Sequence, residues 1–211
     1  MATLILKPGR ERSLMRRHPW IFDTSVERID GPVRNGDTVL VARHDGTPLA
    51  RAGVSLASRI RARVWHFTPD SPVDHAFFRR RIAQAIARRL AHPLLRGQQG
   101  LRLVHGEADG LPGVILDRFG AVAVLQMTFA GAERWREAIV DAIRRVLPEL
   151  EALYERSDSG ARRLEGLEPR SGLLFGTLPE TVVIEEYGVR LLVDVVQGHK
   201  TGFYLDQREN R

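Results

Sequence analysis

Residues 114–127 read VILDRFGAVAVLQM, and this stretch decides the fold of the middle of the chain. Two largely apolar runs, residues 114–117 and 122–127, flank a short turn at residues 118–120 that ends in Gly120. Apolar runs of this length around a turn that contains glycine are typical of a β-hairpin. The sequence therefore predicts two antiparallel strands here.

The segments before and after this hairpin have helical periodicity, because in each of them an apolar residue recurs every three or four positions. These residues are Phe78, Ile82, Ile86 and Leu90 in the first segment and Trp135, Ile139, Ile143 and Val146 in the second. The spacing predicts two amphipathic helices, which end before Pro93 and Pro148. With short strands expected at 153–155, 173–175, 182–185 and 190–196, residues 69–190 are predicted to form a central α+β domain of strands with one or two helices.

The first third of the chain has a different pattern, with short apolar runs separated by turn residues. Strands are expected at 4–6, 37–43, 49–54 and 60–65, and a short helix at 13–17. Asp45-Gly46 is a hairpin signal. Strands at roughly ten-residue spacing are typical of a small β-barrel or sandwich, which we predict for residues 1–68.

The positive charge of the chain is concentrated in this first third. The 211 residues carry 32 Lys and Arg against 26 Asp and Glu, a net charge of +6. Residues 1–65 hold 12 basic and 6 acidic side chains, whereas residues 66–211 hold 20 of each, so the whole excess lies at one end. A coding bias accounts equally well for the preference for Arg over Lys, but not for its concentration. The distribution predicts a site for a polyanion.

Two segments in this region, residues 9–22 and residues 58–65, have a composition typical of RNA binding. Guanidinium groups bind phosphate in a forked geometry, and planar side chains stack on unpaired bases. In strand 60–65, alternation places three Arg on one face, where they repel each other unless a polyanion or acidic side chains neutralise them. We expect Trp20 in the barrel core, with stacking on a base as the alternative. The candidate RNA-binding residues are Arg10, Arg12, Arg16, Arg17, His18, Arg59, Arg61 and Arg63.

Other classes of site are excluded or disfavoured. The chain has no Cys, which excludes disulfides, thiolate metal ligands and a cysteine nucleophile within these residues. The seven His show no spacing typical of a metal site, so no metal is expected. Glu107 and Asp109 lie among Gly and Pro residues and are interpreted as part of a tight structural turn rather than an acid–base pair. The Arg residues at 79–81 and 88–89 are interpreted as a solvated helix face, with an RNA-facing stripe as the alternative.

The cellular location of the protein is predicted from two features that the sequence lacks. No apolar run approaches the ~20 residues that span a membrane. The N-terminus lacks the order of charge and apolar core that defines a signal peptide. We therefore expect a cytoplasmic protein with no membrane partner.

Five segments of the chain resemble one enzyme family. They are GRERSLMRRHPWIF, SRIRARVW, GEADGLPGVILDRFG, YERSD and GHKTGFYLDQRENR, and together they span nearly all 211 residues in the family's order. The family is the bacterial 23S ribosomal RNA 5-methylcytosine methyltransferases that carry a PUA domain. The members of this family consist of three parts: a PUA RNA-binding domain, a central α+β domain and a Rossmann-like domain that binds S-adenosylmethionine. In the family reaction, a cysteine thiolate adds to cytosine C6, and C5 then accepts the methyl group.

The resemblance implies a fold class and a role for each part. We expect an α+β chain with a PUA-like β-barrel (1–68), a central α+β domain (69–190) and only the start (191–211) of a methyltransferase domain that is otherwise absent. The chain would be the RNA-docking portion of the enzyme, inactive alone and without catalytic residues. A complete, non-catalytic PUA adaptor protein is the alternative. Its expected partner is 23S ribosomal RNA, and a homodimer is left open.

The resemblance also implies where the cofactor lies. In the family, the GHKTGFYLDQRENR segment borders the pocket for S-adenosylmethionine. Because the rest of the pocket is expected to be missing, the chain alone is not expected to bind the cofactor tightly. The candidate cofactor-binding residues are Lys200, Thr201, Gly202, Tyr204, Asp206 and Arg208.

Overall fold

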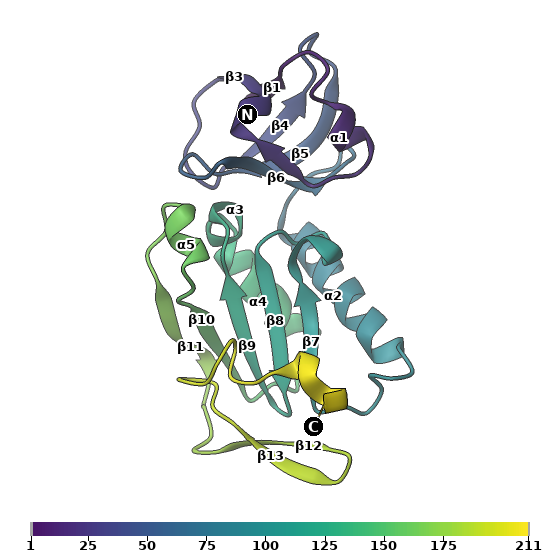
Figure 1. Ribbon diagram of the computed structural model, residues 1–211, viewed down its shortest axis with the longest axis vertical. Helices are drawn as coiled ribbons and strands as arrows, with labels where there is room; N and C mark the ends of the chain where they lie inside the picture. Colours follow the sequence, from purple (N-terminus) through teal and green to yellow (C-terminus); the bar gives the residue numbers. More distant parts are fainter. Residues whose placement is uncertain (1, 211) are drawn as a thin grey trace.

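The computed structural model describes residues 2–210, which form three β-sheets and five α-helices (Figure 1). The strands are β1 (Thr3–Leu6), β2 (Trp20–Phe22), β3 (Val26–Asp30), β4 (Thr38–Ala42), β5 (Pro48–Val54), β6 (Ile60–His66), β7 (Gly100–His105), β8 (Val114–Phe119), β9 (Val122–Met127), β10 (Ala152–Ser157), β11 (Arg170–Gly176), β12 (Val182–Glu186) and β13 (Val189–Val193). The helices are α1 (Arg12–Met15), α2 (His75–Ala91), α3 (Ala130–Arg134), α4 (Arg136–Val146) and α5 (Ala161–Leu164), with 3₁₀ turns at Asp23–Ser25, Gly106–Asp109 and Leu205–Asn210.

The first sheet has six strands in the order β2-β6-β5-β4-β1-β3 and curves around its own apolar core. All neighbouring strands are antiparallel except β1 and β4. In the inner strands β4 and β6, alternate residues point inward and are buried, as at Val39 and Val41 or Ala62 and Val64. Strand β3 was not predicted, because it is an edge strand with exposed charged residues and no apolar run.

The second sheet has five strands in the order β11-β10-β9-β8-β7. The hairpin predicted from residues 114–127 is confirmed as β8 and β9, in a register that pairs Val114 with Met127 and Phe119 with Val122. Gly120 closes the turn with a φ of 62°, a left-handed conformation that glycine adopts without steric cost. Strands β9 and β10 are parallel, and the chain crosses between them through α3 and α4.

Both faces of this sheet are covered, by different parts of the chain. Ala123, Leu125 and Met127 of β9 belong to the core that α2 and α4 complete, whereas Val122 and Val124 belong to a second core with β12 and β13. Figure 1 shows α4 behind the sheet, and the last residues of the chain, in yellow, crossing in front of it. Burial on both faces explains why β9 is apolar at every position but Gln126 and shows no alternation.

The expected content of one or two helices is wrong for the central region, because two short helices, α3 and α5, accompany α2 and α4. Helices of four or five residues complete little more than one turn, so they leave no repeating apolar pattern in a sequence. The contacts of the folded chain hold them instead. Arg162 of α5 is buried and donates to the Met127 carbonyl oxygen at 2.9 Å.

Residues 191–211 were expected to be the start of a separate domain, and up to residue 210 they are part of the packing around the central sheet. Strand β13 pairs with β12, and Phe203 and Leu205 pack against the second core. The Arg156 guanidinium of β10 donates to the carbonyl oxygens of Val195 and Gly198, at 3.3 and 3.1 Å. This segment is therefore held by the sheet.

The barrel and the central sheet meet in a tightly packed seam. Trp65 lies on the barrel strand β6, but its side chain is buried in the central core against Phe78 and Phe129, with ring centroids 5.3 and 5.7 Å apart. Gly53 of β5 makes room for these rings, because a Cβ at residue 53 would lie 2.9 Å from both Phe129 and Trp65 Nε1.

We predict that Gly53→Ala destabilises the protein by about 1–3 kcal/mol, because the new methyl group overpacks the seam. Urea unfolding followed by circular dichroism measures the change. Gly160→Ala is the matched control, since nothing lies within 4 Å of a Cβ at residue 160 and its φ is −58°. Equal midpoints for the two variants would show that the seam is loosely packed.

Glu133 of α3 is the centre of an ion-pair network that joins several elements. Its carboxylate accepts hydrogen bonds from Arg136 at 2.9 and 3.0 Å, from Arg162 at 2.9 Å and from Arg170 at 3.1 Å. Burial alone would raise the pKa of Glu133, but the hydrogen bonds from Arg136 and Arg162 outweigh it and lower the pKa from 4.5 to about 2. The folded state therefore favours the charged carboxylate.

We predict that this network makes the protein less stable in acid. Because the folded-state pKa lies below the unfolded value, the contribution is complete above pH 4.5 and is lost as the pH falls towards 2. It amounts to roughly 2 kcal/mol after allowance for partial solvent contact. Unfolding free energies measured between pH 6 and 3 should fall less steeply in Glu133→Gln than in the unmodified protein. Glu149→Gln, at an exposed ion pair, should keep the original slope.

Candidate functional site

Five of the predicted RNA-binding residues gather around two adjoining hollows on the barrel. The larger hollow, of about 730 Å³, is lined by Arg12, Ser13, Arg16, Arg17, His18 and Pro19. The smaller one, of about 220 Å³, shares Ser13 and His18 and adds Arg10, Trp20 and Phe22 among its lining residues. We call the two together the basic hollow. Its lining is rich in guanidinium groups and includes the His18 and Trp20 rings.

The local sequence explains how these side chains converge. Helix α1 ends after one turn, and Arg17 adopts a positive φ of 64°, which reverses the chain direction ahead of Pro19. Such a backbone is uncommon for a residue with a side chain and is tolerated where surrounding contacts hold it. Here the Arg17 guanidinium lies 5.1 Å above the Phe67 ring.

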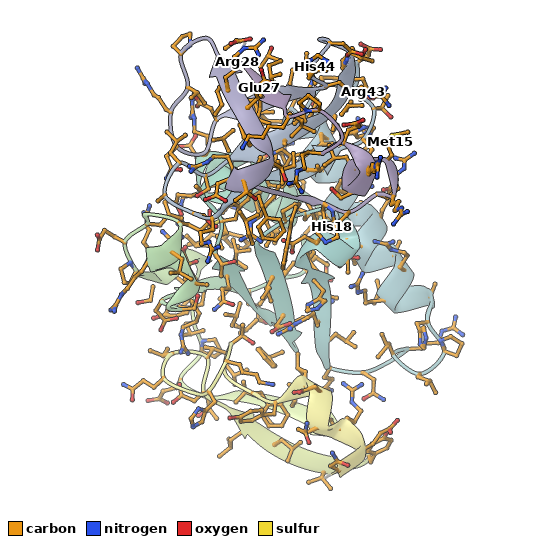
Figure 2. All side chains as sticks on the ribbon, turned by 45° about the horizontal axis from the view of Figure 1, so that its top comes forward. Met15, His18, Glu27, Arg28, Arg43 and His44 are labelled. Carbon is orange, nitrogen blue, oxygen red and sulfur yellow. The ribbon has the colours of Figure 1, made fainter. Side chains whose placement is uncertain are left out.

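The structure adds one cation that the sequence analysis missed. Arg43, at the end of β4, donates to Met15 Sδ of α1 at 3.3 Å. Figure 2 shows Met15, Arg43 and His44 along the same side of the barrel, with His18 nearer the central sheet. Arg43 lies 28 positions from Met15 in the sequence, so no local pattern could associate the two.

The three Arg residues around β6 are not brought together as a surface stripe. Arg59 is exposed. Arg61 turns back to donate to the carbonyl oxygens of Ser55 and Leu56. Arg63 is only 15% exposed and pairs with Glu107 at 2.8 Å and Glu165 at 3.1 Å. Acidic side chains from the 3₁₀ turn after β7 and from the end of α5 therefore neutralise Arg63.

Trp20 lies in neither of the two environments considered from the sequence. Its ring is partly buried at the seam, where the indole N–H donates to Glu107 Oε1 at 2.7 Å and Arg63 lies 5.4 Å above the ring. Burial raises the pKa of Glu107, but the hydrogen bonds from Trp20 and Arg63 outweigh it, and the pKa is lowered. Glu107 thus acts as a charged acceptor for two barrel side chains.

Asp109 confirms the interpretation of its segment as a structural turn. Its carboxylate is buried and accepts hydrogen bonds from the guanidinium groups of Arg88 and Arg89 and from the backbone N–H of His105. These bonds also show that Arg88 and Arg89 of α2 contact the protein itself. In the same helix, Arg79 and Arg80 are exposed.

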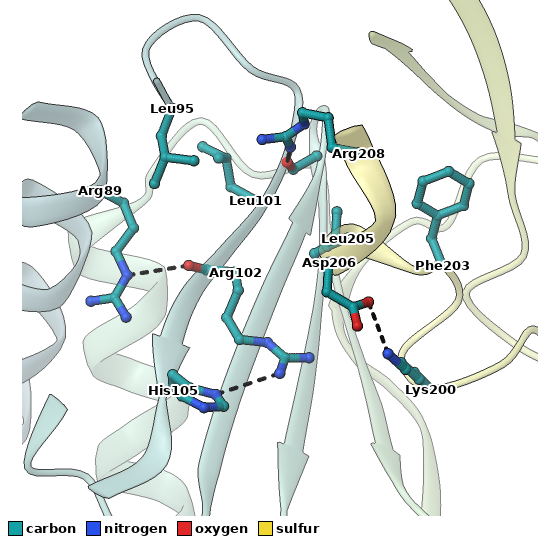
Figure 3. Close-up of a pocket in the computed structure, with 11 residues that line it drawn as sticks. Arg89, Leu95, Leu101, Arg102, His105, Lys200, Phe203, Leu205, Asp206 and Arg208 are labelled. Carbon is teal, nitrogen blue, oxygen red and sulfur yellow. Dashed lines mark hydrogen bonds and ion pairs between the residues drawn. The ribbon is translucent and has the colours of Figure 1, made fainter. Parts of the chain in front are cut away.

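The candidate cofactor residues divide into two groups. Lys200, Asp206 and Arg208 line a cavity of about 430 Å³ between residues 200–208, β7 and the end of α2 (Figure 3). Thr201 and Gly202 are buried, and the Thr201 hydroxyl donates to Asp117 Oδ2 at 2.5 Å. Tyr204 is 42% exposed, with Lys200 Nζ 4.6 Å from its ring centroid. Three of the six residues therefore face one cavity, Thr201 secures the loop, Gly202 is buried in it, and Tyr204 is exposed.

Two kinds of feature are absent from residues 2–210. Among these residues, no group of three or more His, Asp or Glu side chains is arranged to hold a metal ion. No helix in the same range is both long and apolar enough to cross a membrane.

Comparison with known proteins gives three kinds of similarity. Residues 4–67 match the family model of a PUA-like domain. Ribosomal RNA large subunit methyltransferase I of Shewanella amazonensis is 51% identical over 207 residues, 98% of this chain and 52% of that protein. The enzyme of that name from Cronobacter sakazakii is 50% identical over 209 residues, again 52% of its length. The chain thus spans about half the length of these curated relatives.

Solved structures of methyltransferases share the fold. A putative SAM-dependent methyltransferase from Streptococcus mutans superposes with a TM-score of 0.81 at 22% identity, over 100% of this chain and 53% of that one. A putative methyltransferase complexed with SAH superposes with a TM-score of 0.82 at 20% identity, over 100% and 52%.

These superpositions correct the predicted fold class. We expected an α+β chain whose last residues only begin an absent methyltransferase part. Instead, the whole chain, including its last residues, superposes on methyltransferase structures. The description of the chain as separate from the methyltransferase fold is therefore wrong. The physical reason is the packing of β12, β13 and the following residues on the central sheet, which makes them part of one continuous structure.

We predict that Trp20→Phe destabilises the protein by about 1–2 kcal/mol, because it removes the donor to a charged, partly buried acceptor but keeps an aromatic ring. Trp135→Phe is the matched control, since its indole N–H donates to a neutral hydroxyl, that of Thr38, at 3.0 Å. The control should lose less stability in urea unfolding. An unchanged midpoint together with weaker RNA binding would show instead that Trp20 contacts the ligand.

Proposed function

We propose that this chain is the RNA-docking part of an S-adenosylmethionine-dependent methyltransferase that modifies large-subunit ribosomal RNA. The observation that carries the proposal is the basic hollow, which lies in the PUA-like segment where the whole net charge of the chain is found. Its relatives at about 50% identity bear the name of ribosomal RNA methyltransferases, which supports the same substrate class.

The hollow has the chemistry that structured RNA requires. Arg12 and Arg16 are exposed, and neither makes a side-chain ion pair among residues 2–210. Exposed guanidinium groups that no carboxylate neutralises attract phosphates and bind them in a forked geometry. Next to them, the imidazole of His18 offers a flat surface at the rim for an unpaired base. In this proposal, Arg10, Arg12, Arg16, Arg17, His18 and Arg59 contact RNA, while Arg61 and Arg63 stabilise the protein.

The proposed binding of the cofactor involves residues 199–208. Thr201 fixes the loop on the sheet through Asp117. Lys200, Tyr204, Asp206 and Arg208 are the side chains that S-adenosylmethionine would meet. The loop is already ordered by Asp117 and Arg156, so binding would not have to restrict a flexible segment. This arrangement supports a preformed edge of a cofactor pocket.

The finer identity of the reaction is part of the proposal. The resemblance described above points to C5 of a cytosine in 23S ribosomal RNA. Adding a methyl group at C5 requires a polarisable nucleophile on C6, a role suited to a thiolate. Because residues 1–211 contain no Cys, that thiolate would come from outside this segment.

We predict that Arg12→Ala combined with Arg16→Ala weakens binding to a 23S ribosomal RNA fragment. The slope of log affinity against log salt concentration should fall by up to ~0.7–0.9 for each phosphate that the variant no longer neutralises. Filter binding at several salt concentrations measures both quantities. Arg145→Ala combined with Arg163→Ala removes the same charge from exposed helix positions and should leave the slope unchanged. An equal reduction in both double variants would refute a specific site on the barrel.

A further inference from the structure

The proposed cofactor role uses Lys200, Asp206 and Arg208 of the cavity beside residues 200–208, but not Arg89, Arg102 and His105 on its other walls, which are features of an anion site. We propose that it binds a phosphorylated nucleoside, either as a mononucleotide or as one unit of an RNA strand. The cavity lies among α2, β7 and the last segment of the chain, on the central region rather than on the barrel (Figures 1 and 3).

Ion pairs surround the cavity, and in each pair the positively charged side chain faces the cavity. Three guanidinium groups line it, and a buried carboxylate that is not part of the lining holds each of them from behind. The carboxylate side chains are at most 3% exposed, whereas the guanidinium side chains are 13–33% exposed. The pairs are Arg89 with Asp109, Arg102 with Asp117, and Arg208 with Glu186, at nitrogen–oxygen distances of 2.6, 2.8 and 3.2 Å.

This arrangement orients donors before a ligand arrives. A carboxylate on the buried side fixes the plane of each guanidinium, so that little side-chain entropy remains to be lost on binding. In Figure 3, Arg102 and His105 lie side by side on the cavity wall, with 3.4 Å between Arg102 Nη1 and His105 Nδ1. Because a guanidinium only donates, Nδ1 is the acceptor of this contact, and the second N–H of Arg102 Nη1 is the donor that the wall offers to a phosphate.

Lys200 supplies an exposed cation to the lining of the cavity. Its ammonium group pairs with Asp206 at 2.9 Å, and the two side chains are 43% and 60% exposed. An exposed pair of this kind contributes little stability, so the ammonium group can exchange its partner at low cost. A phosphate at the Arg102 wall would give it an alternative anionic partner.

The remaining lining is apolar and suits a base or ribose. Leu95, Leu101, Phe203 and Leu205 contribute it, from the loop after α2, from β7 and from the last segment. The volume of about 430 Å³ lies within the usual ~300–1,000 Å³ range of small-molecule pockets, near its lower end. One nucleotide matches this combination of a phosphate-binding wall and an apolar floor.

The test uses three ligands that share adenosine and differ at the 5′ carbon: adenosine 5′-monophosphate, adenosine and S-adenosylhomocysteine. Each is titrated into the ¹⁵N-labelled 211-residue protein and followed by amide chemical shifts. We expect the monophosphate to shift residues 89–105 as well as 200–208. The two ligands without phosphate should leave residues 89–105 unshifted, and S-adenosylhomocysteine should shift at most residues 200–208, which the proposed cofactor role assigns to it. No shift of residues 89–105 with the monophosphate, or equal shifts of these residues with S-adenosylhomocysteine, would overturn the proposal.

Two lysine variants test the contact itself, since the chain contains only Lys7 and Lys200. Lys200→Gln should weaken the monophosphate roughly three- to tenfold by removing a charged donor, and Lys200→Arg should restore binding. Lys7→Gln removes the same charge from the barrel and should have no effect. Equal affinities of Lys200→Gln and the unmodified protein would exclude the proposed phosphate position.

A competition experiment with RNA distinguishes the two possible sources of the ligand. A single-stranded oligoribonucleotide that reverses the monophosphate shifts identifies the RNA strand as the ligand, whereas retained shifts identify a free nucleotide. The inference rests on the proposed function only for the RNA source. If the Arg12 and Arg16 variants bind RNA normally, the proposed barrel site fails, while the mononucleotide result decides this cavity separately.

Discussion

The structure depends on a single strand, β6, that contributes to two hydrophobic cores. Ala62 and Val64 are buried inside the barrel, whereas Trp65 is buried in the core of the central sheet. A register shift against β5 in this part of the strand accompanies the switch, since a bulge redirects the side chains that follow it. The barrel is thereby fixed on the sheet by buried apolar contact. The basic hollow consequently has a defined position relative to the cavity at residues 200–208.

Buried carboxylates organise much of the remaining structure. Asp109, Asp117 and Glu165 are almost fully buried, and each holds at least one Arg side chain. The forked guanidinium can satisfy both oxygens of a carboxylate, which an ammonium group cannot do with the same geometry. The abundance of Arg thus has an intramolecular use besides the two explanations considered from the sequence. Arg63 illustrates the distinction, because it has the sequence context of an RNA ligand and the surroundings of a structural ion pair.

The last segment of the chain shows how packing alters a functional expectation. Considered as sequence, residues 191–211 form a polar loop with several glycines, for which ordering on a ligand would cost about 1–2 kcal/mol per residue. In the structure, Arg156 and Asp117 bind this segment from two strands of the central sheet. Its side chains therefore border a preformed cavity. The same contacts connect it to the fold that the chain shares with methyltransferase structures.

The sequence alone determined the elements that depend on local periodicity and the side-chain clusters whose residues are neighbours in the chain. The β8–β9 hairpin, helices α2 and α4, and the cluster from Arg10 to His18 belong to this class, because their defining residues lie within one element or turn. Tertiary structure alone decided the seam. Trp20 and Arg63 meet Glu107 across 87 and 44 positions, and no periodicity relates residues so far apart. It also decided that Arg63 is neutralised by acidic side chains, since a strand pattern gives the face of a residue but not what packs against that face.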